Sequence, residues 1–84
     1  MRSLDSIRSQ IEKVDLKMKD LFIERMNLIK EVKIIKDELN LGYTDLKRED
    51  YLKNKLSSDL VEYKDLYLSF MDYIFKLSKE LMND

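Results

Sequence analysis

Apolar residues recur at intervals of three and four along the first half of the chain. They are Leu4, Ile7, Ile11, Val14, Met18, Leu21, Leu28, Val32, Ile35 and Leu39. This spacing places them in one stripe along a helix. Ser3 is a suitable N-cap for that helix, and Asn40-Leu41-Gly42 is a suitable stop. The pattern therefore predicts a single helix from Leu4 to Leu39.

The predicted first helix is too long for a monomeric core. At 1.5 Å per residue, roughly 36 residues extend over about 54 Å. A compact globule of 84 residues has a diameter of only roughly 30 Å. The apolar stripe therefore needs a partner, and the simplest partner is a second copy of the chain. We expect a homodimer.

A second periodic segment begins at Thr44 or Asp45, either of which is a good N-cap. Its stripe consists of Leu52, Leu56, Leu60, Tyr63, Tyr67, Phe70, Ile74, Leu77 and Leu81. Because the rhythm never fails, the segment fits either one helix, which gives a two-helix hairpin, or two shorter helices. A break would fall at residues 62–65, with Asp65 as the cap of a third helix, or at residues 57–59.

The amino-acid composition agrees with an all-α protein and excludes several kinds of catalytic site. The 84 residues form one domain, residues 1–84, and they include no Pro and one Gly. The chain has no His and no Cys. Ser-His-Asp and Cys-His catalysis are therefore excluded, and the commonest metal ligands are missing. We expect neither a metal site nor a cofactor.

The net charge and the first residues of the chain indicate which partners and which cellular location to expect. With 16 Lys and Arg against 17 Asp and Glu, the net charge is −1. Broad affinity for nucleic acid or for an anionic membrane is therefore not expected. The first ten residues, MRSLDSIRSQ, lack the apolar core of a signal peptide, and no apolar run is long enough to span a bilayer. We expect a cytoplasmic protein.

Three charged residues interrupt the two stripes. Arg25 stands where the first stripe requires an apolar residue, and the second stripe, extended backwards, passes through Glu49 and Asp45. A guanidinium on an apolar stripe costs several kcal/mol unless it finds an anion, so Arg25 belongs either to a structural ion pair or to a ligand site. Lys36 lies on the same helical face, about 16 Å farther along the axis.

The order and spacing of these residues resemble the all-helical chorismate mutases. The resemblance covers nearly the whole chain and is most specific up to Glu49. In that family two chains, each with a long, a medium and a shorter helix, intertwine into a six-helix homodimer with two active sites. Such a dimer would account for the overlong first helix. The residues that carry the resemblance are LDSIRSQIEKVD at positions 4–15, Glu24-Arg25, Lys36, Asp45, Arg48 and Glu49.

The resemblance implies the rearrangement of chorismate to prephenate, on the route to Phe and Tyr. This reaction needs no nucleophile, metal or proton transfer, because orientation of the substrate and charge stabilisation at the breaking ether bond are sufficient. By resemblance, Arg25 would clamp one substrate carboxylate, and Arg8 of the other protomer would hold the second. Lys36 would donate to the ether oxygen and also contact one carboxylate.

The start of the second helix would add further contacts of the same kind. The resemblance implies that Arg48 supports the substrate carboxylates. It also implies that Glu49 and the backbone around Asp45 hold the hydroxyl group on the substrate ring.

In the last helix, family members carry a Gln or Glu that makes a second contact to the ether oxygen, four residues after a small polar residue. If Ser78 is that small residue, Met82 takes the position of the donor. A shift of register gives Glu80 instead. Both alignments stay open here, with Ser78 as a secondary contact.

Two other functions fit parts of the sequence. An isochorismate pyruvate-lyase on the same fold would act on a substrate with the same charges and the same ether. A non-enzymatic dimeric helical bundle or adaptor would explain both apolar stripes. It would not explain why Arg25, Asp45 and Glu49 interrupt them.

Overall fold

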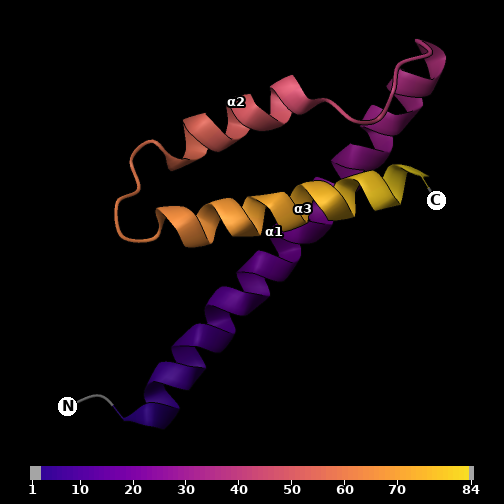
Figure 1. Cartoon of the computed structure of the whole chain (residues 1–84). Helices are drawn as coiled ribbons and strands as arrows, with labels where there is room; N and C mark the ends of the chain where they lie inside the picture. Colours follow the sequence, from indigo (N-terminus) through magenta and orange to yellow (C-terminus); the bar gives the residue numbers. More distant parts are fainter. Residues whose placement is uncertain (1–2, 84) are drawn as a thin grey trace.

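The computed structural model describes residues 3–83, which form three helices and no strand (Figure 1). They are α1 (Leu4–Glu38), α2 (Leu46–Ser57) and α3 (Lys64–Asn83). The predicted all-α fold, with a long first helix and two shorter ones, is confirmed. The two-helix hairpin is wrong, because residues 58–63 leave helical geometry although the apolar rhythm continues through them.

Local side-chain signals set the ends of α1. The Ser3 hydroxyl accepts a hydrogen bond from the Ser6 amide at 3.1 Å, as expected of an N-cap. At the other end, Asn40 adopts a positive φ of 55°. The Leu41 amide then donates to the Lys36 carbonyl at 2.8 Å. This is the Schellman arrangement, in which Asn, rather than the nearby Gly42, takes the left-handed position.

Asp45 caps α2, since its carboxylate accepts from the Arg48 amide at 3.0 Å. At the end of α2, the Ser57 hydroxyl donates to the Lys53 carbonyl at 2.6 Å. The expectation that Asp65 caps the third helix is wrong. Asp65 lies inside the first turn of α3, where its negative charge still suits the helix dipole.

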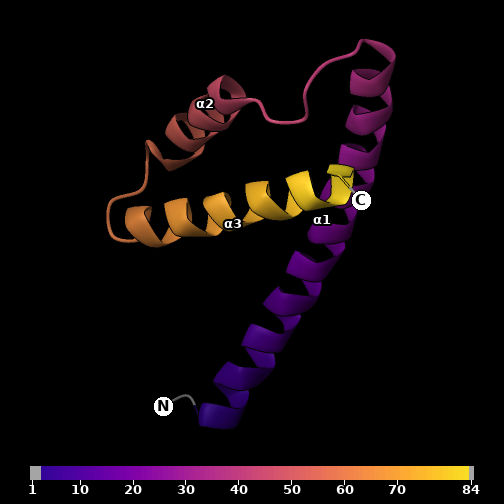
Figure 2. The same cartoon turned by 45° about the vertical axis from the view of Figure 1, so that its right-hand side comes forward.

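Helix α3 packs against both α1 and α2, and it carries most of the buried side chains (Figures 1 and 2). An ion pair between Lys53 and Asp72 joins α2 to α3. Both views show α3 crossing α1, while the N-terminal half of α1 extends away from the other two helices. The buried residues on α3 are Met71, Phe75, Ser78 and Met82.

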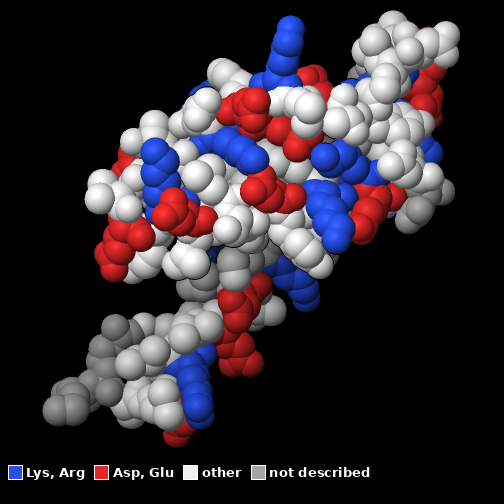
Figure 3. Space-filling view, in the orientation of Figure 1, with Lys and Arg blue, Asp and Glu red and all other residues white. Residues whose placement is uncertain are grey.

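A single chain is not compact. Its extents are 57 × 25 × 16 Å and its radius of gyration is 16.3 Å, compared with about 12 Å for a compact chain of this length. Helix α1 has no buried residue, and its projecting end stands apart in Figure 3. Within residues 3–83, no helix combines the length and apolarity that crossing a membrane would require.

Candidate active site

A cavity of about 500 Å³ opens where the C-terminal half of α1, the start of α2 and the end of α3 meet. Of the residues expected in the site, all line this cavity except Arg8 and Glu80. Its polar lining consists of Arg25, Lys36, Tyr43, Asp45, Arg48, Glu49, Ser78 and Lys79. Its apolar lining consists of Leu28, Ile29, Val32, Leu52, Phe75 and Met82.

Arg25 reaches from the middle of α1 across to α3. Its Nη1 donates to the Ser78 Oγ at 2.5 Å, and its guanidinium carbon lies 5.9 Å from the centre of the Phe75 ring. Burial lowers the pKa of Arg25 from its ordinary value, but a guanidinium remains charged at neutral pH. Among the carboxylates of residues 3–83, none forms an ion pair with it. Arg25 is therefore a partly buried cation that lacks an anion within the described chain.

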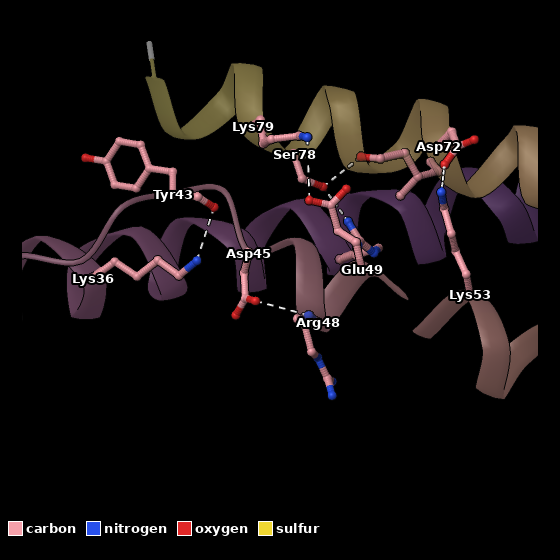
Figure 4. Close-up of polar contacts among 11 residues, drawn as sticks. Lys36, Tyr43, Asp45, Arg48, Glu49, Lys53, Asp72, Ser78 and Lys79 are labelled. Atoms are coloured by element: carbon pink, nitrogen blue, oxygen red, sulfur yellow. Dashed lines mark hydrogen bonds and ion pairs between the residues drawn. The ribbon is translucent and has the colours of Figure 1, made fainter. Parts of the chain in front are cut away.

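The turn after α1 positions Lys36. The Lys36 Nζ donates to the Tyr43 carbonyl at 3.1 Å (Figure 4). The Tyr43 phenol donates to the Asp37 carboxylate, and this hydrogen bond raises the pKa of Tyr43. The same turn is thus held to the last turn of α1 by two hydrogen bonds. They keep the Lys36 ammonium at the cavity wall.

The start of α2 contributes three charged residues to the cavity lining. The Asp45 carboxylate is occupied in capping the helix. The Arg48 guanidinium lies 5.2 Å from the centre of the Tyr51 ring. Glu49 faces α3, and its Oε2 lies 3.5 Å from the Lys79 Nζ. Asp45 sets the residue at which α2 begins, and Arg48 and Glu49 follow in the first turn of the helix. The cap therefore brings the three residues together.

Helix α3 presents Ser78 and Met82 to the cavity, and both are buried. Four residues separate them, so they share one helical face. Glu80 is two residues from each, about 200° round the helix, and it is exposed and outside the cavity lining. The expectation that Glu80 enters the site is therefore corrected for this cavity. Of the two residues that the alternative alignments named, Met82 lines the cavity.

Arg8 is exposed and lies in the projecting part of α1. It is 17 residues from Arg25, or about 25 Å along the helix axis. Because α1 is continuous between the two residues, Arg8 does not reach the cavity of its own chain.

The sequence profile of the chorismate mutase type II family matches residues 7–83. The match spans nearly all of α1 and the whole of α2 and α3. The chain belongs to the chorismate mutase type II family. No curated protein sequence matches it significantly, and neither does any solved structure.

The charges of the cavity suit the substrate of a chorismate mutase. Four basic and two acidic residues line it, so basic residues are in excess by two. Chorismate carries two carboxylates, so the charges are complementary. No cluster of three or more potential metal-binding side chains occurs among residues 3–83. The cationic residues are Arg25, Lys36, Arg48 and Lys79.

Two polar residues of the cavity, Tyr43 and Lys79, were not among those expected. Tyr43 contacts Lys36 through its backbone carbonyl, which any residue could supply, and its phenol contacts Asp37 only because the chain turns back after α1, so no local pattern marked it. Lys79 did have a signal. It lies about 100° from Ser78 and about 60° from Met82 on the helical wheel, so any helix that presents both to a cavity brings Lys79 to its edge.

Proposed function

We propose that this protein is a cytoplasmic chorismate mutase, which rearranges chorismate to prephenate in the biosynthesis of Phe and Tyr. The observation that carries the proposal is Arg25. It is a partly buried cation on an apolar stripe, it lines a cavity of about 500 Å³, and no carboxylate of residues 3–83 neutralises it. Such a charge is unfavourable in the empty protein and is stabilised when an anionic ligand binds.

In the proposed mechanism the cations fold the substrate and stabilise the transition state. Arg25 binds one carboxylate, and Arg48 supports the carboxylates from the start of α2. Lys36 donates to the ether oxygen, where negative charge develops as the C–O bond breaks. Glu49 and the backbone at Asp45 hold the ring hydroxyl. Because the reacting carbons are then held together, orientation supplies several kcal/mol of the barrier reduction.

The third helix differs from the family pattern. In the alignment that we adopt, Met82 takes the position of the family's Gln or Glu, and a thioether has no hydrogen to donate. Ser78 keeps its place beside Arg25 and is a secondary contact. We infer that Lys36 and Arg25 carry the larger share of the electrostatic stabilisation in this protein.

We further propose that two chains intertwine into a six-helix homodimer and that Arg8 acts in the partner's site. The apolar stripe of α1 supports this assembly, because Ile11, for example, is 54% exposed in the single chain. A second support is an apolar groove of about 700 Å³. It is wide enough to receive side chains of a helix from another copy. Its lining includes Met18, Leu21, Phe22, Leu56, Tyr67 and Phe70.

The activity is tested by incubating the purified protein with chorismate and following the loss of its ultraviolet absorbance. The product is identified by NMR, and we expect prephenate. Release of pyruvate from isochorismate without turnover of chorismate would instead indicate the lyase. A folded dimer that acts on neither substrate would favour the non-enzymatic bundle.

The shared site is tested by mixing two inactive variants, Arg8→Ala and Arg25→Ala, and allowing the chains to exchange. Each heterodimer then contains one site with both arginines intact. With random pairing, activity should recover to about a quarter of the wild-type level. No recovery after exchange has been verified by mass spectrometry would contradict the role of Arg8 in the partner's site.

A further inference from the structure

Helix α3 supplies four side chains to the cavity, and only one of them has a hydrogen to offer a ligand. Phe75 and Met82 are apolar. The Ser78 hydroxyl already donates its single hydrogen to the Ile74 carbonyl at 2.8 Å, and its oxygen accepts from Arg25. The ammonium of Lys79 is therefore the donor that remains on this wall.

The surroundings of Lys79 keep its ammonium at the cavity. Its Nζ lies 3.5 Å from the Glu49 Oε2, and the two side chains are 32% and 19% exposed. Figure 4 shows them converging from α3 and α2, next to Ser78. An ammonium has three hydrogens, so one contact to Glu49 leaves two for a ligand. Lys76, on the same helix, lies instead over the Tyr73 ring and outside the cavity.

We propose that Lys79 is a further catalytic residue, which donates a hydrogen bond to an oxygen of chorismate from the α3 side of the cavity. This assignment rests on the proposed function. Glu49 has two roles in it, since it holds the ring hydroxyl and also orients the Lys79 ammonium. Arg25, which reaches across to Ser78, and Lys36 are then joined by a cation that α3 itself supplies. The substrate oxygens are bound from both sides, although Met82 offers no donor.

The assignment is tested with Lys79→Met and Lys79→Arg, and Lys76→Met serves as the control with the same charge change. Three quantities are measured: kcat and KM for chorismate, and the affinity for prephenate by calorimetry. We expect Lys79→Met to lower kcat/KM about tenfold or more and to weaken prephenate binding. Lys79→Arg should retain most of the activity, and Lys76→Met should match the wild type. A loss in kcat indicates contact with the ether oxygen, and a rise in KM indicates contact with a carboxylate.

A second comparison separates direct contact from an effect through Glu49. If Lys79 touches the substrate, Lys79→Met still lowers kcat/KM in a Glu49→Gln background. If Lys79 only orients Glu49, the second substitution has no further effect, and the assignment is overturned. If the wild type is active and Lys79→Met has the same kcat/KM as Lys76→Met, the assignment of Lys79 is overturned and the proposed function stands. A wild type that neither turns over chorismate nor binds prephenate overturns the proposed function, and the assignment with it.

Discussion

The two halves of α1 follow the same apolar rhythm and have different surroundings. Every residue from 3 to 24 is exposed. Beyond that point Arg25, Ile29 and Lys36 are partly covered and line the cavity. The contrast shows that the apolar periodicity predicts which face of a helix is apolar. Whether that face is covered depends on the tertiary packing. The C-terminal half of α1 contributes to the cavity, although Leu28 and Ile35 of its stripe are still 53% and 55% exposed. The N-terminal half has no partly covered residue among residues 3–24.

The uncovered half is energetically unfavourable as it stands. Leu4 is 61% exposed, Val14 53% and Leu21 64%. Covering an aliphatic side chain stabilises it by about 1.5–3 kcal/mol when burial is complete. Several such residues on one stripe provide enough free energy for a dimer. Under the proposed function, the C-terminal half of α1 would carry the chemistry and the N-terminal half would assemble the dimer, with Arg8 as the exception.

The largest expected effect is on the chemical half. Arg25→Ala should lower kcat/KM about a thousandfold, because it removes the cation on which the proposal rests. The free energy of unfolding should change little, or rise, since a partly buried charge without an anion disappears. Both are measured by chorismate turnover and thermal melting, with exposed Lys30→Ala as the control. An activity loss that merely followed a loss of helix would contradict the ligand role.

The next effect tests the assembling half. Ile11→Asp should lower the free energy of unfolding by about 3 kcal/mol or more, because a carboxylate would enter a dimer interface. Ser9→Asp introduces the same side chain about 200° round the helix and should have little effect. Melting temperature and sedimentation mass are measured over a range of concentrations, where dissociation and unfolding should coincide. A folded wild-type species with the mass of one chain would remove the basis for this prediction.

A smaller effect is expected at the end of α3. Met82→Gln should raise kcat several-fold, because it adds a donor that is used mainly in the transition state. Glu80→Gln introduces the same side chain on the exposed face and should leave kcat unchanged. The wild-type kcat/KM should also be flat from mildly acidic to neutral pH, since no carboxyl group has to be protonated. If Glu80→Gln changed the pH dependence of kcat/KM, Glu80 would have to be part of the site.

The smallest effect concerns the turn that holds Lys36. The hydrogen bond to Asp37 raises the pKa of Tyr43, so the stabilisation that it provides is complete below the ordinary tyrosine pKa of about 10. It is lost as pH rises through the higher pKa of the folded state. In an ultraviolet titration, Tyr43 should ionise above the usual range, and Asp37→Asn should return it there. The stability difference between the two proteins should shrink in alkaline solution.

The start of a helix can be predicted from the sequence wherever a capping residue marks it. Ser3 and Asp45 cap α1 and α2 through contacts that span three residues, and such contacts depend on the neighbouring sequence alone. The charged residues that interrupt the apolar stripes can also be recognised from the sequence. Arg25, Asp45 and Glu49 are recognisable because they break a stripe, and all three line the cavity.

The break in the second segment and the residues of α3 that line the cavity depend on contacts between distant parts of the chain. The apolar rhythm runs unbroken through residues 58–63, so no local signal distinguishes one helix from two. Met82 rather than Glu80 lines the cavity, and Lys79 joins it opposite Glu49. These outcomes depend on how α3 is rotated against α1 and α2. That rotation is set by contacts between residues far apart in the chain, such as Arg25 and Ser78, which no local pattern encodes.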